Sequence, residues 1–340
     1  MQRIAWLDLV KGISIILVVY YHFIIGPYNR GLSQGMLDKN IFDSINHFIT
    51  YNLAPLRMPL FFLVSGYLSK SAIDKPWSAV FTSRVSLYIY LFVIWGFVHR
   101  AIVFLLGIDT SDFIILKSNY AESTLEFLTL TLIGASSLWY LYALALYFCI
   151  CKFFNSYRVT CIIALIICSV ASKSLPLIFP YKNMIYCVFF YAVGVFYGEK
   201  LFSLFESLKW KSLYYLAPAL LVLTYLRFIN FSHYFLESVV FVLLAIFTLM
   251  YLSKLFRFRL LNKIGKNTLA VYIFHTPLLE FYSFIALPFI LELEFLIQFN
   301  HIGYSIFMPL ILIPFTVLSA TIVATLIKKS PGKVLFDFRQ

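Results

Sequence analysis

Charged side chains are scarce in this sequence. Aspartate, glutamate, lysine and arginine make up 12% of the 340 residues, whereas hydrophobic residues make up 62%. A soluble domain carries about 25% charged residues, so this composition excludes an ordinary soluble protein. Apolar runs recur along the whole length, and no stretch is long and polar enough to form a separate soluble domain. We therefore expect one transmembrane domain over residues 1–340, an all-α polytopic bundle.

Motifs for metal binding, disulfides and repeats are also missing. There is no Cys-x-x-Cys or His-x-x-x-His pair, so we expect no metal site. The five cysteines all fall in apolar runs and are predicted to be small buried residues. No internal sequence repeat supports an inverted-repeat transporter.

Ten apolar runs are predicted to span the membrane. They cover residues 7–25, 48–69, 84–106, 138–154, 159–172, 184–199, 212–229, 234–254, 268–290 and 305–327. The second contains Pro55 and Pro59, and either one kinked helix or an interfacial helix followed by a short span fits it. Residues 121–134 precede the fourth run, are too short to cross, and predict a half-inserted helix.

The positive charge is distributed unevenly between the two sides that these spans define. With both termini in the cytoplasm, 18 of the 27 lysines and arginines face the cytoplasm, eight face outward, and Lys11 lies within the first span. This asymmetry follows the positive-inside rule. It explains the net charge of +12 without a nucleic-acid partner, which we do not expect.

Three ionisable residues lie in or beside the first span. Lys11 and His22 are eleven residues apart, which is 20° more than three full turns, so they share one helix face roughly 16 Å apart along the axis. Asp8 lies one turn before Lys11 on the same stripe. Ionisable groups in a span cost about 2.5–3.5 kcal/mol each at the bilayer centre, and they commonly mark functional sites. We interpret Lys11 as either a cytoplasmic anion site or a cation neutralised by Asp8, and His22 as a candidate general base.

Five further residues are candidates with a structural alternative. Arg84 opens the third span and also fits a simple positive-inside anchor. Arg57, before the apolar part of the second span, either anchors that helix or contacts a polar acceptor. Trp139 and Tyr140 fit an interfacial aromatic belt or a platform that stacks on a sugar ring. His275 lies inside the ninth span, two residues before a proline, and is a second polar candidate.

These residues lie in segments that resemble a known family. RIAWLDLVKGISIILVVYYHF, RMPLFFLVSGYL, FTSRVSLYIYLFVIW, SSLWYLYAL and IGKNTLAVYIFHTPLL follow the order seen in the membrane acyltransferase-3 family, which includes bacterial O-acetyltransferases of surface polysaccharides. The likeness runs from residue 3 to about residue 327. The Asp8-x-x-Lys11-Gly12 form is similar to the branch of fucose 4-O-acetylase-like and enterobacterial-common-antigen-type O-acetyltransferases. Lys11 stands where the family usually has arginine, with ten residues between it and the histidine.

The resemblance implies a multi-pass O-acetyltransferase of the bacterial inner membrane. Acetyl-CoA would be the cytoplasmic donor substrate, and the acceptor would be a sugar hydroxyl of a surface polysaccharide or lipid-linked glycan. The implied site consists of His22 and Asp8 as catalytic residues, Lys11 and Arg84 at the donor, and Arg57, Trp139, Tyr140 and His275 at the acceptor.

Two other classes of function stay open at the level of sequence. A polysaccharide exporter or flippase would need a wide polar path, and the spans hold few charged residues. A proton-coupled transporter would use Asp8, Lys11 and His22 as a relay along one helix face.

Overall fold

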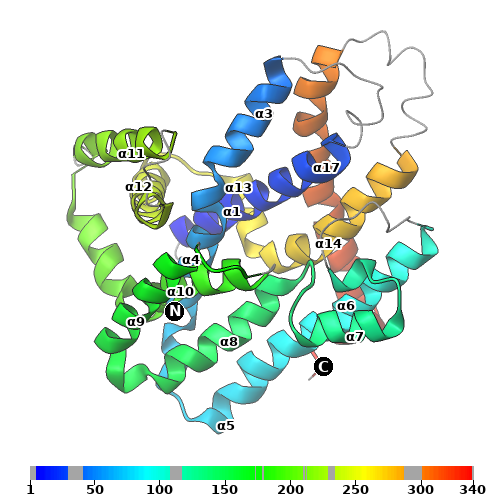
Figure 1. Ribbon diagram of the computed structural model, residues 1–340, viewed down its shortest axis with the longest axis horizontal. Coiled ribbons are helices and arrows are strands. Elements are labelled where there is room, and N and C mark those ends of the chain that lie inside the picture. The colour runs from blue at the N-terminus through cyan, green and yellow to red at the C-terminus, as the bar shows by residue number, and fades with distance from the viewer. Residues whose placement is uncertain are drawn as a thin grey trace. The chain divides into compact units, whose positions relative to one another are not determined.

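The described part of the chain is helical. The computed structural model describes residues 5–29, 41–107, 117–172, 174–177, 180–209, 211, 213–228, 234–286 and 301–338, and it contains no strand within them. The α-helices (Figure 1) are α1 (Ala5–Phe23), α3 (Ile41–Asn52), α4 (Ala54–Ile73), α5 (Trp77–Val80), α6 (Leu87–Leu105), α7 (Thr124–Leu132), α8 (Trp139–Phe153), α9 (Arg158–Ala171), α10 (Tyr181–Ser207), α11 (Leu213–Phe228), α12 (Tyr234–Leu255), α13 (Arg259–Lys266), α14 (Thr268–Phe281) and α17 (His301–Lys329). The π-helical segments are η1 (Ile24–Tyr28), η2 (Phe81–Ser86) and η6 (Tyr282–Ala286), and the 3-10 segments are η3 (Ser118–Tyr120), η4 (Asn155–Tyr157) and η7 (Pro331–Leu335).

Length and apolar composition confirm an all-α polytopic membrane protein. Six helical stretches among the described residues are long and apolar enough to cross a bilayer, and two bent helix pairs raise the number to eight if each pair is one span. α3 and α4 form one such pair, bent by 42°, and α8 with η4 and α9 forms the other, bent by 70°. The count of ten spans and the cytoplasmic location of both termini stay predictions.

The break between α3 and α4 accounts for the irregular second run. The two helices separate at Leu53, shortly before Pro55, while α4 continues through Pro59. α3 buries Asp43, Asn46 and Thr50 on one face. The opposite face of α3 exposes apolar residues: Ile41, Ile45, Phe48 and Ile49. Since polar groups point into the protein and apolar groups point out, α3 suits contact with lipid.

The segment before the fourth run also forms the short helix that was predicted. α7 has nine residues, and the Ser123 hydroxyl caps it by accepting from the Glu126 backbone N–H at 3.1 Å. Glu126 in turn accepts from the backbone N–H of Glu122, the residue before the cap, which further fixes the start of the helix. The exposed side chains of α7 include Leu125, Leu128 and Leu132, so its outward face is apolar.

The chain alternates between two compact units. Unit 1 comprises Met1–Ser14, Ala54–Ser86 and Ala143–Lys266, and unit 2 comprises Ile15–Leu53, Leu87–Tyr142 and Asn267–Gln340. Both α1 and α8 contribute residues to the two units. Each unit is assembled from three separate stretches of sequence. The expected single domain stays a prediction.

In unit 1, α4 and α10 pack at close range (Figure 1). A Cβ on Gly66 would lie 2.0 Å from the Tyr191 carbonyl oxygen, and one on Gly194 would lie 2.0 Å from the Leu63 carbonyl oxygen. Small residues allow such backbone approach in membranes, and Gly66 and Gly194 provide it between α4 and α10. Cys151, Cys161 and Cys187 are buried as expected, but Cys168 is exposed on α9, where its neighbours Ile163, Ile167 and Val170 also face outward.

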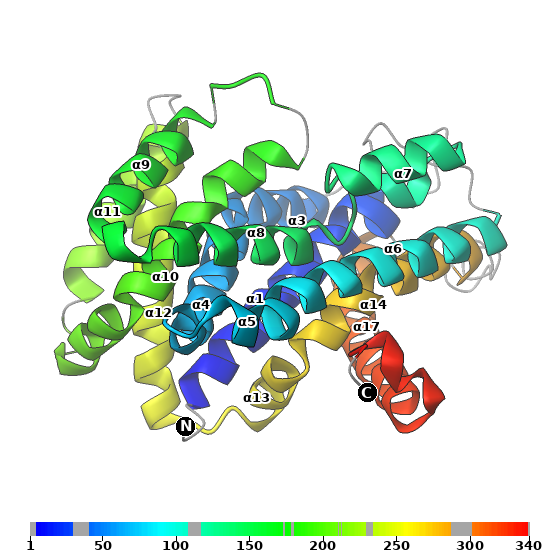
Figure 2. The same cartoon turned by 90° about the horizontal axis from the view of Figure 1, so that it is seen from below.

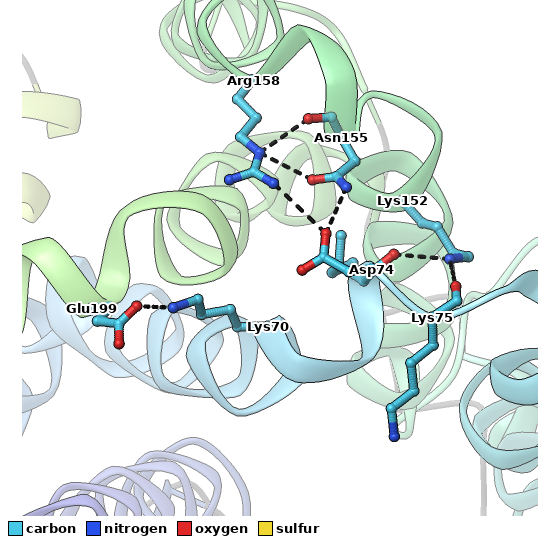
Figure 3. Close-up of polar contacts among 8 residues, drawn as sticks. Lys70, Asp74, Lys75, Lys152, Asn155, Arg158 and Glu199 are labelled. Carbon is cyan, nitrogen blue, oxygen red and sulfur yellow. Dashed lines mark hydrogen bonds and ion pairs between the residues drawn. The ribbon is translucent and has the colours of Figure 1, made fainter.

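Polar contacts join three connections of unit 1 that were predicted to share the cytoplasmic side. Figure 3 shows Lys70 at the end of α4 paired with Glu199 of α10. Asp74 accepts from Asn155 at 2.9 Å and lies 3.7 Å from the Arg158 guanidinium. Lys152 donates to the backbone carbonyls at the end of α4. The connections after α4 and α8 therefore lie together in this unit, with Glu199 of α10 paired to the last turn of α4.

In unit 2, α14 packs against both α6 and α17 (Figure 2). Pro277 of α14 has no N–H to donate to the carbonyl of Ile273, four residues earlier. The buried His99 of α6 fills this role, with its Nε2 atom 2.8 Å from the Ile273 oxygen. His99 is thus a structural residue that ties α6 to α14.

The same device recurs at α17. Pro309 cannot donate to the carbonyl of Ser305, and the Asn46 amide of α3 donates to that oxygen at 3.0 Å. Ser305 also donates from its hydroxyl to Asp43 at 2.6 Å, and Tyr28 donates to the same carboxylate. Two carbonyls that proline leaves without a helical donor are therefore paired by side chains from neighbouring helices.

This pairing predicts a specific coupling between His99 and Pro277. His99→Leu should lower the unfolding free energy by about 1–3 kcal/mol, because a buried carbonyl loses its donor. In a Pro277→Ala background the alanine N–H takes over, so the same change should cost clearly less. Thermal melting of the four purified variants in detergent measures the coupling.

The matched control combines His99→Leu with Pro314→Ala in α17. That alanine restores an N–H donor to a different carbonyl, which His99 does not contact. The effects of these two changes on the unfolding free energy should be additive. If His99→Leu lowered the unfolding free energy equally with and without Pro277, His99 would not be the donor that replaces the missing N–H of Pro277.

Candidate functional site

The first half of α1 places Asp8 and Lys11 in unit 1. The Lys11 ammonium lies 2.9 Å from the Asp8 carboxylate, and Asp8 is buried while Lys11 is partly exposed. The expected ion pair one turn apart is therefore present. α1 is uninterrupted from Ala5 to Phe23, so the predicted register of Lys11 with His22 on one helix face holds.

α13 crosses this turn of α1 at very short range. A Cβ on Gly12 would lie 2.3 Å from the Leu261 oxygen, and one on Gly265 would lie 1.7 Å from the Asp8 oxygen. α13 carries Arg259, Lys263 and Lys266, so a short basic helix is fixed against the Asp8–Lys11 turn. The motif LNKIGK, in which Gly265 lies between Lys263 and Lys266, is the part of the sequence that indicates this contact.

The two candidate arginines belong to the same unit. Arg84 is partly exposed in the π-helical segment η2, and Arg57 is buried in α4. π-Helical turns are rare and are frequent at functional sites. The structure places Arg57 in unit 1 with Asp8, Lys11 and Arg84, whereas the other expected acceptor residues lie in unit 2.

His22 lies in the last turn of α1, immediately before η1, whose Pro27 interrupts the regular helix. Its ring centroid lies 5.1 Å from that of His275, with the two ring planes inclined by 53°. His275 is fully buried, whereas His22 is partly exposed. The two histidines predicted from separate spans are thus neighbours in unit 2.

Hydrogen bonding defines the tautomer of His275. Its Nδ1 atom lies 2.7 Å from the Tyr272 backbone oxygen, which can only accept, so Nδ1 carries the proton. Nε2 is then the acceptor nitrogen, and the Thr276 hydroxyl lies 3.3 Å from it. Nε2 of His275 is therefore a hydrogen-bond acceptor that is held in a fixed position next to the His22 ring.

Trp139 and Tyr140 are inside the protein and do not form an aromatic belt. Both are buried at the start of α8. The Tyr140 backbone N–H donates to the Tyr272 hydroxyl at 3.1 Å, which donates to the Ser137 carbonyl at 3.2 Å. The Tyr140 side chain lies in the same part of unit 2 as His275, because the Tyr272 ring contacts both Tyr140 and His275.

Polar residues that the sequence reasoning did not select surround this group. Glu280 of α14 is buried and accepts from the Tyr120 hydroxyl. Asn119, also buried, accepts from the Ser137 hydroxyl at 2.9 Å. Burial lowers the pKa of the Lys117 ammonium, and the nearby Glu280 carboxylate opposes that shift. Glu280 carried a readable signal, an acid inside an apolar run, whereas Asn119 and Lys117 lie in a connection without periodic pattern.

The helices and the buried polar groups define a multi-pass membrane protein with an intramembrane histidine site. Comparison with known proteins then assigns its family. The family described as an acyltransferase domain, of the acyltransferase-3 type, matches residues 4–329. The inner membrane protein YcfT of Escherichia coli K12 is 30% identical over 298 residues, which cover 83% of this chain and 81% of that protein. No solved structure gives a significant match.

The chain therefore belongs to the acyltransferase-3 family, and it is a membrane acyltransferase. The match spans nearly the whole chain and includes each of the residues discussed above. The family resemblance drawn from the ordered motifs is confirmed.

The close approach of α13 to α1 gives a stability prediction. Gly265→Ala should lower the unfolding free energy by about 1–3 kcal/mol, because the added methyl group collides with the Asp8 carbonyl. Gly96→Ala in α6 is the matched control, since a Cβ there meets no atom within 4 Å. It should be neutral or stabilising by up to about 1 kcal/mol through helix propensity. Thermal melting in detergent distinguishes the two, and equal melting temperatures would contradict the α1–α13 contact.

Proposed function

We propose that this protein is an O-acetyltransferase of the bacterial inner membrane. It moves an acetyl group from cytoplasmic acetyl-CoA to a sugar hydroxyl of a surface polysaccharide or a lipid-linked glycan. The observation that carries the proposal is the His22–His275 pair, with ring centroids 5.1 Å apart, in which His22 lies on the helix that also bears the Asp8–Lys11 ion pair. Family membership supports the reaction class, acyl transfer.

Lys11 and Arg84 are the proposed contacts of the donor phosphates. Lys11 is paired with Asp8, and the adjacent Gly12 contacts the short basic helix α13. Several cations near one another favour a polyanion such as the phosphates of coenzyme A. Lysine binds phosphate as a point charge, whereas arginine grips it with a planar fork, so Lys11 demands less geometric precision than arginine would.

His22 is the proposed general base. The acceptor hydroxyl attacks the thioester carbonyl carbon while His22 takes the hydroxyl proton. The carbon–oxygen bond of the new ester forms, the carbon–sulfur bond breaks, and the coenzyme A thiolate leaves and takes up a proton. His275 donates its Nδ1 proton to the Tyr272 carbonyl, and its ring lies against the ring of His22. Its Nε2 nitrogen is proposed to face the sugar.

The acceptor is proposed to bind in unit 2, beside Trp139, Tyr140 and His275. Aromatic rings and buried hydrogen-bonding groups are the usual partners of a sugar. A contact of Arg57 with a polar part of the acceptor stays a proposal from the sequence. Membrane lipids surround the bundle and are the natural source of a lipid-linked acceptor.

His22 gives the first functional prediction. His22→Ala and His22→Gln should reduce acetyl transfer by about 10²–10⁴-fold, the usual contribution of a general base. The measurement is the O-acetyl content of extracted polysaccharide, together with transfer from radiolabelled acetyl-CoA in isolated membranes. His47→Ala, a change of an exposed histidine on α3, is the control that should retain activity.

Normal acetylation by a stably inserted His22→Ala protein would rule out the catalytic role. A deletion strain that accumulates unexported glycan with normal acetylation would instead favour an exporter. Absent acyl-CoA binding with pH-dependent solute uptake into vesicles would favour a proton-coupled transporter.

The donor contact at Lys11 gives a second prediction. Replacing both members of the ion pair, Asp8→Asn with Lys11→Met, avoids leaving a buried carboxylate unpaired. This double variant should raise the KM for acetyl-CoA about tenfold or more, because a charge-assisted phosphate contact is lost. Acetyl-pantetheine lacks the nucleotide phosphates, so its KM should stay within about twofold of that of the unmodified protein.

Lys11→Arg is the matched control, since it keeps the charge, and its KM for acetyl-CoA should change little. Equal KM values for acetyl-CoA in the unmodified and double-variant proteins would show that Lys11 does not contact the donor.

A further inference from the structure

A cluster of buried polar atoms lies beside the histidine pair in unit 2. Its members are Lys117, Ser118, Asn119 and Tyr120, from the connection around η3, and Glu280 of α14. Ser118, Asn119 and Glu280 are at least nine-tenths buried. Within the part of the chain that the structure describes, Ser118 Oγ, Asn119 Nδ2 and Glu280 Oε2 have no hydrogen-bond partner.

Hydrogen bonds fix these groups in position and connect them to the histidine site. The Ser118 backbone N–H donates to the Ala135 carbonyl at 2.7 Å, and the Ser137 hydroxyl donates to Asn119 Oδ1. The Ser137 carbonyl accepts from Tyr272, whose own carbonyl holds His275 Nδ1.

Glu280 is held from the other side. Its Oε1 atom accepts from Tyr120, which leaves Oε2 as the unpartnered oxygen. Glu280 lies five residues beyond His275 on α14, about 7.5 Å further along the axis. Five residues also turn the helix by about 140°, so the connection to His275 is the hydrogen-bond chain through Asn119, Ser137 and Tyr272, and Glu280 extends the cluster toward the end of α14 that the predicted topology places outside.

The unpartnered atoms call for a particular kind of ligand. A buried polar atom without a partner costs about 1–3 kcal/mol, so three in one cluster are rarely kept for packing alone. Together they offer a hydroxyl, an amide donor and a carboxylate acceptor. A group with several adjacent hydroxyls pairs with all three.

The charges of the cluster favour an uncharged ligand. The Lys117 ammonium and the Glu280 carboxylate interact electrostatically and balance one another. Arg100, the nearest cation on α6, donates to the Ala121 carbonyl and lies 5.0 Å from the centroid of the Phe127 ring, so it is engaged elsewhere. A further buried charge on the ligand would have no partner left and would be costly.

We infer that Ser118, Asn119 and Glu280 form the acceptor subsite and that it binds an uncharged, hydroxyl-rich sugar residue. This inference rests on the proposed acetyl transfer and specifies its acceptor. Lys117 and Tyr120 position Glu280, and the acceptor hydroxyl that reacts points from this subsite toward His22.

Ser118→Ala and Glu280→Gln test the subsite. Ser118→Ala removes an atom without a protein partner, and Glu280→Gln keeps the shape and an oxygen that can accept from Tyr120, so neither should lower the melting temperature by more than a few degrees. The assay uses purified protein in lipid nanodiscs, radiolabelled acetyl-CoA, and graded amounts of a glycolipid extract from the producing cells. The half-saturating amount of extract should rise about threefold to tenfold for Ser118→Ala and more than tenfold for Glu280→Gln, as expected for lost neutral and charged hydrogen bonds. The KM for acetyl-CoA should stay unchanged.

The matched controls make the same chemical changes elsewhere. Glu126→Gln alters a half-buried carboxylate in the first turn of α7, where the glutamine oxygen can still accept from Glu122, and Ser253→Ala alters a hydroxyl of α12 that bonds its own helix. Both should leave the half-saturating amount of extract unchanged.

The labelled product identifies the class of acceptor. After hydrolysis to monosaccharides that keep the ester, label should be found in a neutral sugar. Label in a uronic acid or a sugar phosphate, or an unchanged half-saturating amount of extract in both variants, would overturn the subsite while acetyl transfer itself stands. Unmodified protein that transfers no label to the extract would overturn the proposed function, and the subsite with it.

Discussion

The fold of unit 2 depends on pairing two backbone carbonyls that proline leaves without a helical donor. Lipid supplies no hydrogen bonds, so an unpaired carbonyl within a span is costly. Pro277 and Pro309 each create one, and His99 and Asn46 pair them from neighbouring helices. These two bonds fix α6 against α14 and α3 against α17. The helix that carries His275 is therefore held where proline would otherwise weaken it, and the position of the histidine site follows from that constraint.

Some helices of this protein expose apolar side chains, while polar groups are buried in its interior. α3 and α7 expose leucine, isoleucine and phenylalanine, while buried carboxylates, amides and hydroxyls meet inside unit 2. Asp43, for example, accepts from both Tyr28 and Ser305. The same arrangement around η3 and α14 leaves Ser118, Asn119 and Glu280 with hydrogen-bonding atoms that the described protein does not use. Structural networks satisfy their own members, whereas a binding site keeps some atoms for its ligand. The contrast between the two clusters is the physical basis for assigning the second one to the acceptor.

Much of the candidate site was predictable where a residue violates the composition of its span. Asp8, Lys11, His22 and His275 are ionisable groups in apolar runs, and the helix period alone put the first three on one face. Glu280 obeys the same rule and was overlooked. Ser118 and Asn119 were not predictable, because serine and asparagine in a short connection look like any turn. The buried positions of Trp139 and Tyr140 were also hidden, since an aromatic pair at a helix start suits both a lipid interface and a protein interior.

The sequence by itself determined the all-α membrane class, the family, the break near Pro55 and the registers along single helices. Each of these depends on local composition, on the order of motifs or on the period of one helix. Only the tertiary structure decided that His22 lies beside His275 and that α13 crosses α1 at Gly12. It also showed that His99 serves Pro277 and that the polar atoms around η3 gather near Glu280. These are contacts between segments far apart in sequence, and they are set by which side chains fit and which backbone groups need a partner, neither of which a linear pattern records.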